Sequence, residues 1–371
     1  MKKLLLLAAL VGVAFTSCVK NEEHGSADAK QQITFEPAKY KAQAGRAGEV
    51  VFPQQESFGA FAFYRTTAVA SEDHSSFMDN VKISYVAAAT PYWGSEELYY
   101  WPESAGSHLD FISYYPYNED KTAAAVPQIS SSDQQQTIQY VNYAVTDNTD
   151  LMYSDKALNQ TRNTLNYSFT GVPTLFRHAL AKLNFKVKAT MMNNAATSPQ
   201  SVTNWVVTIK KISLNNIYNT GSVTLKTVNV HDQGATTSQW VNQTTEAHNV
   251  WNHTSATITK EWAYDQVLTT TATTYGVGDT AAENYFVLPQ AFVEAGQSIT
   301  VEYAIQTTAP GGQSASVDKT KTVHFINYPA VAAWEMGKNI TYTLQIDPEG
   351  DVIHFAPAIV DWETGNGTID L

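Results

Sequence analysis

The sequence predicts an all-β protein built from two antiparallel β-sandwich domains in tandem. Three observations support this class. Short runs of β-branched and aromatic residues alternate apolar and polar side chains with period two, which is typical of strands with one buried face. Clusters of Gly, Pro, Asn, Asp and Ser separate these runs and indicate turns. The length of 371 residues is sufficient for two domains of ordinary size.

The composition excludes several classes of protein. Hydrophobic residues make up 43% of the chain, aromatic residues 12% and charged residues only 16%, whereas a disordered chain would have few aromatics and much more charge. The net charge is −12 and no basic stretch is present, so nucleic acid is not an expected partner. With one cysteine, no internal disulfide can form, and the fold must depend on packing.

Residues 1–17 are predicted to be a signal peptide. Two lysines precede an apolar run, Leu4–Phe15, which is shorter than the roughly 20 residues that span a bilayer. The only cysteine, Cys18, follows directly after Ser17, and this arrangement resembles a lipoprotein signal box. We therefore expect Cys18 to carry the acyl chains of a lipid anchor. The alternative is a chance cysteine beside an ordinary cleavage site. Residues 18–32 are polar and small, as in a lipidated tether.

The first predicted domain covers residues 33–173. Its expected strands share the alternation described above, and no long helical pattern interrupts them. They lie at 33–36, 58–64, 81–86, 109–115 and 137–143.

The second predicted domain covers residues 174–371. In its first run, Leu183, Phe185 and Val187 alternate with polar residues, which indicates one buried and one solvated face. We place the join near Gly171 and Pro173, and expect long exposed loops or a decorated hairpin between about 226 and 280. The expected strands lie at 181–187, 205–209, 211–217, 223–225, 284–288, 299–305, 322–325 and 340–346.

A series of motifs extends along nearly all of residues 33–362, and together, in this order, they resemble the fimbrillin family, the subunits of the type V pilus. No single motif is diagnostic, but the ordered set is. The motifs are Ser57–Tyr64, Phe77–Lys82, Tyr99–Pro102, Leu109–Pro116, Asp150–Tyr153, Leu175–Leu183, Tyr285–Gln290, Trp334–Lys338 and Ile353–Trp362.

The resemblance implies two transthyretin-like sandwiches and the role of a structural subunit, stalk or tip, of a cell-surface fimbria that supports adhesion. Members of the family are exported as lipoproteins to the outer membrane, with palmitate as the type of anchor. An arginine-specific protease removes the first strand. A strand from a partner subunit then fills the groove, which is a form of β-augmentation. The implied partners are other pilin subunits, that protease and the outer membrane.

The resemblance places the cut between Arg46 and Ala47, where flanking Gly and Ala favour an accessible segment. The removed strand would lie within 33–46 and contain Ile33 and Phe35, which are apolar on one face. The alternative is that Arg46 is an ordinary loop arginine.

The donor strand is expected in the C-terminal region. Ile353 and Phe355 form one short apolar stretch, and Ile359 and Trp362 form another beyond Pro357. The alternative is that these residues form the last strands of the second sandwich.

Motifs for catalysis, phosphate binding and calcium binding are not found, so we expect no enzymatic activity, cofactor or metal. Nine histidines are scattered along the chain. The closest pair, His248 and His253, is expected to be solvated, and His178 is expected to be structural.

The aromatic residues permit a competing function: a lipid-anchored surface adhesin or glycan-binding lipoprotein that never polymerises and binds a host or bacterial surface ligand. Tyr99–Trp101 are expected in the core. Trp240, Trp251 and Trp262 lie in a polar region and are candidates for an exposed ligand-facing surface. Thr280, in Asp-Thr-Ala, resembles an O-glycosylation site.

Overall fold

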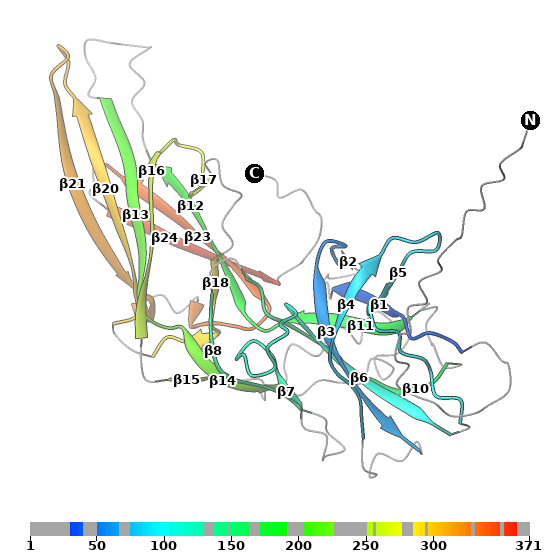
Figure 1. Cartoon of the computed structure of the whole chain (residues 1–371). Coiled ribbons are helices and arrows are strands. Elements are labelled where there is room, and N and C mark those ends of the chain that lie inside the picture. Colours follow the sequence, from blue (N-terminus) through cyan, green and yellow to red (C-terminus); the bar gives the residue numbers. More distant parts are fainter. Residues whose placement is uncertain are drawn as a thin grey trace, which may run out of the picture.

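The computed structural model describes residues 30–39, 50–66, 75–104, 106–129, 137–146, 149–162, 171–190, 204–225, 251–254, 257–276, 285–293, 296–327, 331–348 and 352–361. These residues form β-strands, with a 3₁₀ helix at Phe325–Asn327. In Figure 1 the N-terminal strands, blue to cyan, gather at one end, and the C-terminal strands, yellow to red, at the other. The predicted all-β class and sandwich arrangement are confirmed. Among the described residues, no helix is long and apolar enough to cross a membrane.

The first sheet contains nine strands and closes on itself. Its order is β10-β6-β3-β4-β5-β1-β11-β9, β2 pairs with β1, and an additional pairing joins β6 to β9. A ring of seven strands therefore runs from β6 through β1 and back to β6. The strands are β1 Phe35–Lys39, β2 Val50–Val51, β3 Ser57–Arg65, β4 Ser75–Val86, β5 Tyr92–Gly94, β6 His108–Tyr115, β9 Met152–Ser154, β10 Ala157–Gln160 and β11 Val172–His178.

The C-terminal half is a sandwich of two sheets. The first has the order β17-β12-β23-β24 with β18 beside β12, the second has the order β16-β13-β20-β21, and β19 pairs with β22 in a small third sheet. The strands are β12 Ala181–Ala189, β13 Asn204–Tyr218, β16 Thr257–Val267, β17 Thr273–Thr274, β18 Tyr285–Val287, β19 Gln290–Ala291, β20 Ser298–Thr308, β21 Ser314–His324, β22 Ala333–Trp334, β23 Lys338–Asp347 and β24 Val352–Asp361.

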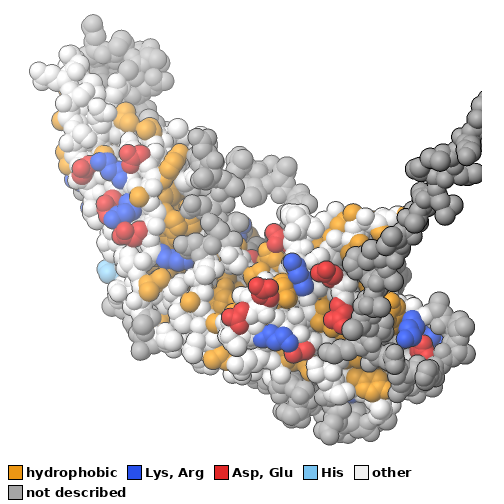
Figure 2. All heavy atoms as spheres, viewed as in Figure 1, with side chains coloured by type: hydrophobic (Ala, Val, Ile, Leu, Met, Phe, Trp, Pro, Cys, Tyr) orange, Lys and Arg blue, Asp and Glu red, His pale blue; other side chains and the backbone are white. Residues whose placement is uncertain are grey.

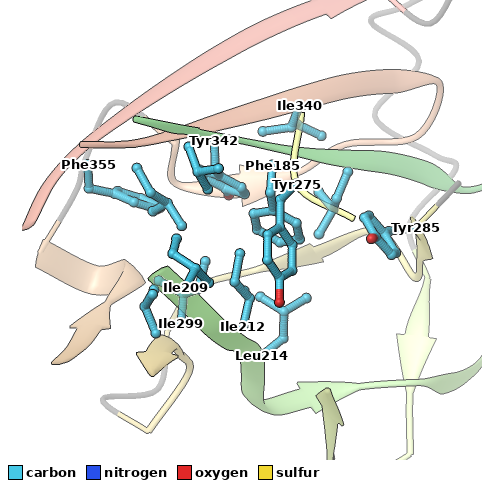
Figure 3. Packing of buried hydrophobic residues seen from close by; sticks show 14 of the residues in the cluster. Phe185, Ile209, Ile212, Leu214, Tyr275, Tyr285, Ile299, Ile340, Tyr342 and Phe355 are labelled. Atoms are coloured by element: carbon cyan, nitrogen blue, oxygen red, sulfur yellow. The ribbon is translucent and has the colours of Figure 1, made fainter. Parts of the chain in front are cut away.

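Large apolar side chains fill the space between these two sheets (Figure 3). Phe185 of β12 and Tyr342 of β23 face Ile209 and Leu214 of β13, and all four are completely buried. Figure 2 shows acidic and basic side chains interspersed among uncharged ones on the face viewed. On this face charges of both signs are thus mixed, and aromatic side chains contribute to the core.

A fifth sheet connects the two halves. It has the order β15-β14-β8-β7, with β7 Gln128–Ile129, β8 Ile138–Ala144, β14 Thr220–Leu225 and β15 Asn252–His253. Strand β8 precedes the predicted domain boundary and β14 follows it. The boundary itself, between residues 173 and 174, falls within β11. Gly171 and Pro173 suggested a break in the chain, but the strand begins at Val172, directly after Gly171, and continues through Pro173 to His178.

Two strand pairs run parallel, β1 with β11 and β12 with β23. The alternation of side chains shows which face of a strand is buried, but it carries no information on the direction of the neighbouring strand. All the other pairs among the described strands are antiparallel.

The sequence located at least part of most long strands, including the end of β21, but missed β16 entirely. Residues 257–267 were expected in exposed loops or a decorated hairpin, but they form β16, which pairs with β13. The mostly exposed side chains of β16 hide its alternation. Conversely, the two strands expected at 205–209 and 211–217 are one strand, β13, whose register shifts between Ile209 and Lys211.

Four asparagines with positive φ produce bulges within strands. Asn80, Asn142, Asn159 and Asn216 have φ angles of 56, 52, 56 and 53°. Each lies at a point where the register with the neighbouring strand shifts by a residue or more. Asparagine tolerates the left-handed region better than other residues with a Cβ, because its short side chain can hydrogen-bond locally.

Replacing Asn142 tests this role. Asn142→Ala is expected to lower the free energy of unfolding by about 1 kcal/mol, because alanine is penalised at positive φ, whereas Asn142→Gly should be close to neutral. Urea denaturation measures both. Gln139→Ala, at another exposed position of the same strand, is the control and should change stability little. Equal stabilities of the alanine and glycine variants would contradict the assignment.

Candidate assembly site

Strand β1 occupies a central position in the closed sheet. It pairs in parallel with β11 over five residues, from Phe35 opposite Val172 to Lys39 opposite Phe176. On its other side Phe35 pairs antiparallel with Trp93 of β5, and the end of the strand pairs with β2. Removing β1 would open the ring between β5 and β11.

The residues before β1 are hydrogen-bonded on both sides. The amide of Ile33 donates to the carbonyl of Tyr99 at 2.8 Å, and the amide of Trp101 donates to the carbonyl of Gln31 at 3.0 Å. On the other side the amide of Val172 donates to the carbonyl of Thr34 at 2.7 Å. Residues 31–39 therefore act as one long central strand, although only 35–39 are regular.

The apolar face of this strand enters the core, as the sequence predicted. Ile33 and Phe35 are 2% and 4% exposed. The ring of Phe35 meets those of Phe58 and Phe111 edge-on, with centroids 5.8 and 5.7 Å away. Burying an Ile and a Phe contributes about 1.5–3 kcal/mol each. Without the strand, Phe58 and Phe111 would line an apolar groove.

Gly171 permits the close approach of β11 to β1. A Cβ at this position would lie 2.7 Å from the carbonyl carbon of Phe35 and 2.8 Å from the carbonyl oxygen of Thr34. Both atoms belong to the backbone and cannot rotate away. The sequence analysis assigned Gly171 to a domain join. This assignment missed its contact with β1, because a glycine next to a proline is a typical break signal.

Pro37 lies at a point where no ladder donor is needed. Because the carbonyl of Thr34 faces β11, the backbone groups of Phe35 and Pro37 face the opposite side. There, β5 pairs at Phe35 and β2 pairs from Ala38 onward, so position 37 lies between the two. Proline is otherwise rare in a central strand because it cannot donate to the ladder.

Aromatic hydroxyls near this strand remain uncharged at neutral pH. Burial raises the pKa of Tyr115, and the nearby Glu56 carboxylate raises it further. Burial and then Glu97 raise the pKa of Tyr99 in the same way. The surroundings of β1 are therefore suited to an apolar strand.

The proposed cut lies in the connection between β1 and β2. Those strands pair antiparallel through Ala38 and Val51 and through Lys39 and Val50. Arg46 and Ala47 belong to this connection and lie outside the described residues. Cys18, Thr280 and Trp362 lie outside them as well.

The arginines within the described residues differ in accessibility. Arg65 is 2% exposed and pairs with the buried carboxylate of Asp110 at 2.7 Å. Arg177 donates two bonds of 2.8 Å to Asp155. Arg162 is exposed. A protease could therefore reach Arg162 in the folded chain far more readily than Arg65.

Three of the four predicted donor residues, Ile353, Phe355 and Ile359, lie in one strand, β24, at an edge of the C-terminal sheet. All ten residues pair with β23, including Pro357 opposite Tyr342, so the two expected short stretches are continuous. Phe355 is 8% exposed and stacks on Tyr342 at 4.7 Å (Figure 3). Ile359 and Val360 are 44% and 57% exposed. Among the described strands, β23 is the only partner of β24.

The expected exposure of Trp251 is wrong. Its side chain is 3% exposed, and its indole nitrogen donates to the carbonyl of Ala179 at 3.0 Å. Trp262 packs between Phe185 and Tyr285, with centroids 5.6 and 4.4 Å away. A polar neighbourhood in the sequence does not report the buried partners that a tryptophan finds across the fold. Trp240 lies outside the described residues.

The expected core position of the Tyr99–Trp101 segment is confirmed for Trp101, which is 5% exposed, whereas Tyr99 and Tyr100 are partly buried. The structural assignment of His178 is also confirmed, because its Nδ1 lies 2.8 Å from the carboxylate of Asp150.

His253 does not extend freely into solvent. It stacks on Tyr218 at 4.7 Å, and its Nε2 lies 2.8 Å from the carbonyl of Pro289. His248 lies outside the described residues. Within the described ranges, no group of three or more His, Cys, Asp or Glu side chains is placed to hold a metal ion.

Comparison with known proteins gives one family. The model of the fimbrillin-like family matches residues 45–362. No curated protein sequence matches the chain.

Among solved structures, a fimbrial protein from Bacteroides vulgatus is similar with a TM-score of 0.57 and 15% identity, covering 90% of this chain and 100% of that one. Putative cell adhesion proteins from Bacteroides uniformis and Bacteroides ovatus have TM-scores of 0.45 and 0.44. Their identities are 16% and 14%, and the alignments cover 91% of this chain and 100% of each of theirs.

Gly171→Ala tests the contact between β11 and β1. The added methyl group collides with the backbone of Phe35, so the free energy of unfolding should fall by about 1–3 kcal/mol. Backbone amides of residues 31–36 should exchange at least about tenfold faster, as measured by hydrogen-exchange mass spectrometry.

Gly312→Ala is the control for this variant. A Cβ at Gly312 meets nothing within 4 Å, although its φ is +87°, so that variant should be mildly destabilised without faster exchange in β1. Unchanged exchange of residues 31–36 in Gly171→Ala would contradict the close contact.

Proposed function

This chain belongs to the fimbrillin-like family, and we propose that it is a subunit of a cell-surface fimbria that assembles by protease-triggered exchange of β-strands. The position of β1 carries the proposal. The strand lies between β5 and β11 in the ring, yet one chain connection, residues 40–49, joins it to the described strands that follow. A cut in that connection leaves β1 held to them by non-covalent contacts alone.

Loss of β1 would create a groove with unpaired backbone groups and exposed apolar side chains. The carbonyl of Tyr99 and the amides of Trp101 and Val172 would lose their partners, and the rings of Phe58 and Phe111 would meet water. Unpaired edges and exposed apolar surface favour the addition of another strand. The uncut chain avoids this state because its own strand occupies the groove.

The family match covers residues 45–362. In this proposal the segment 33–46 is a protective strand that is absent from the assembled subunit.

We assign export to the lipoprotein route. Residues 1–17 would be removed as a signal peptide, and Cys18 would carry the acyl chains, palmitate among them, that hold the precursor at the outer membrane. Cleavage at Arg46 would separate the fold from this anchor together with β1. The same cut would thus release the subunit and activate it.

The donor in this proposal is β24, with Ile353, Phe355 and Ile359 as its apolar residues and Trp362 beyond them. An edge strand with a single neighbour is easier to withdraw than a central strand. Other pilin subunits are the partners. A host or bacterial surface ligand and a glycan at Thr280 are further proposals.

A competing proposal is a surface adhesin that never polymerises. Its candidate ligand surface is weakened by the burial of Trp251 and the packing of Trp262 against the core. The two proposals differ in the fate of the chain after proteolysis.

Treatment of the purified precursor with an arginine-specific protease tests the proposal. We expect a new N-terminus at Ala47 by mass spectrometry and filaments by negative-stain electron microscopy. Arg46→Gln should stay uncut at this bond and form none. Arg162→Gln is the matched control, because Arg162 is exposed, and should assemble like the wild type. Filaments from Arg46→Gln would contradict the proposal, and stable cleaved monomers that bind glycan would favour the adhesin.

A further inference from the structure

Strands β1 and β24 share a sequence. Residues 33–38 read Ile-Thr-Phe-Glu-Pro-Ala and residues 353–358 read Ile-His-Phe-Ala-Pro-Ala, so four of six positions are identical. The two segments lie near opposite ends of the chain and in different sheets. Pairing with the same neighbouring strand therefore does not explain the match.

The matched positions are mainly those that face a core. Ile33, just before β1, and Phe35 and Pro37 within it are buried. In β24, Phe355 belongs to the C-terminal core and Ile353 packs against it. The intervening residues, which point the other way, differ between the strands: Thr and Glu in β1, His and Ala in β24. The shared residues are thus mainly the side chains that a strand would insert into the core.

We propose that β24 of one subunit replaces β1 of the next in the register that this match defines. Ile353 takes the place of Ile33, Phe355 that of Phe35 and Pro357 that of Pro37. The order of the side chains requires the same direction, so the incoming strand lies parallel to β11 and antiparallel to β5. This inference rests on the proposed function, which names β24 as the donor, and adds the direction and register in which it binds.

The proline fixes the register against slippage. At position 37 the backbone nitrogen faces the gap between the β5 and β2 pairings, where no donor is needed. A shift of two residues would place Pro357 at position 35, opposite Trp93, where a ladder donor would be lost. The same shift would move Phe355 out of the space between Phe58 and Phe111.

The incoming strand would also remove one unsatisfied hydrogen-bond donor. In the uncut chain the side-chain nitrogen of Gln32 is buried and has no hydrogen-bond partner among the described residues. Position 32 corresponds to Val352 in the proposed register. An apolar side chain there leaves no donor unsatisfied, and an unsatisfied buried donor is costly. The donor therefore fits this part of the groove better than the strand it replaces.

A disulfide between subunits tests the register. Gln32 pairs with Tyr100 across an antiparallel bridge, flanked by the bonds from Ile33 to Tyr99 and from Trp101 to Gln31. These flanking bonds define a non-hydrogen-bonded pair, with Cα atoms about 4.5 Å apart, a separation that a disulfide spans. The proposed register puts Val352 of the donor in the place of Gln32.

The chain that carries Val352→Cys and Tyr100→Cys is cut with the arginine-specific protease and oxidised under mild conditions. We expect a ladder of covalent oligomers on non-reducing gels. The native Cys18 precedes Arg46, so the introduced cysteines are the only ones left in the cut chain. Within one subunit residue 352 pairs with Asp347 of β23, so the link must form between subunits.

His354→Cys with Tyr100→Cys is the matched control, because a shift of two residues would bring position 354 opposite Tyr100. It should give no ladder. Filaments that cross-link through residue 354, or through neither residue, would overturn the register and leave strand exchange intact. Failure to form any filament would instead count against the proposed function.

A peptide separates the two kinds of failure. The peptide of residues 351–361 carrying Val352→Cys should cross-link to the cut Tyr100→Cys chain even where filaments do not form. With Phe355→Ala in the peptide, binding should weaken about 100-fold, since a buried phenylalanine side chain is lost. Ala356→Ser, on the outward face, should bind like the parent peptide. Equal binding of the Phe355→Ala and parent peptides, or no cross-link, would overturn the inference.

Discussion

The insertion of Phe35 between Phe58 and Phe111 is the contact on which the N-terminal half depends. It joins β1, β3 and β6, which are not all neighbours in the sheet order, and thereby holds the opposite sides of the ring together. The backbone hydrogen bonds on both sides of residues 31–39 close the sheet around these aromatic contacts. A strand in such a position normally stays for the lifetime of a protein, because its removal exposes both edges and core.

Alternation along the chain was sufficient to predict most strands, because one face of each strand is buried and the other is solvated. The prediction of Ile33 and Phe35 as one apolar face is an example. Strand β16 was missed because most of its side chains are exposed and Lys260 and Gln266 interrupt the apolar residues on one face, which hides its alternation. Trp251 was misplaced for a related reason: its partner, the carbonyl of Ala179, is 72 residues away. The direction of β1 relative to β11 is likewise absent from local pattern, since a parallel and an antiparallel strand bury the same residues.

The two halves are joined by packing as well as by chain. Ile138 and Tyr140 of β8 share a buried cluster with Val223 and Leu225 of β14, and Trp251 completes it. This cluster draws on strands from both sides of the predicted domain boundary. In the proposed filament, tension would pass from the groove in the N-terminal half to the donor in the C-terminal half. The shared cluster and sheet at the junction of the halves are better suited to carry this load than a flexible linker, because it then passes through packed side chains and hydrogen-bonded strands.

The resemblance between β1 and β24 explains how one sequence can suit two environments. In its own subunit Phe355 stacks flat on Tyr342, whereas in the groove the equivalent ring meets two others edge-on; both arrangements are favourable for aromatic pairs. In its own sheet β24 has one neighbouring strand, and in the groove it would have neighbours on both sides. The proposed exchange would therefore increase the number of backbone hydrogen bonds around β24 while keeping its core-facing side chains buried. In the uncut chain β1 already occupies the groove with the same three side chains, which would block this exchange. The proposed cleavage would alter neither strand and would change only the effective concentration of β1, which is high for a tethered strand and falls once the peptide is released.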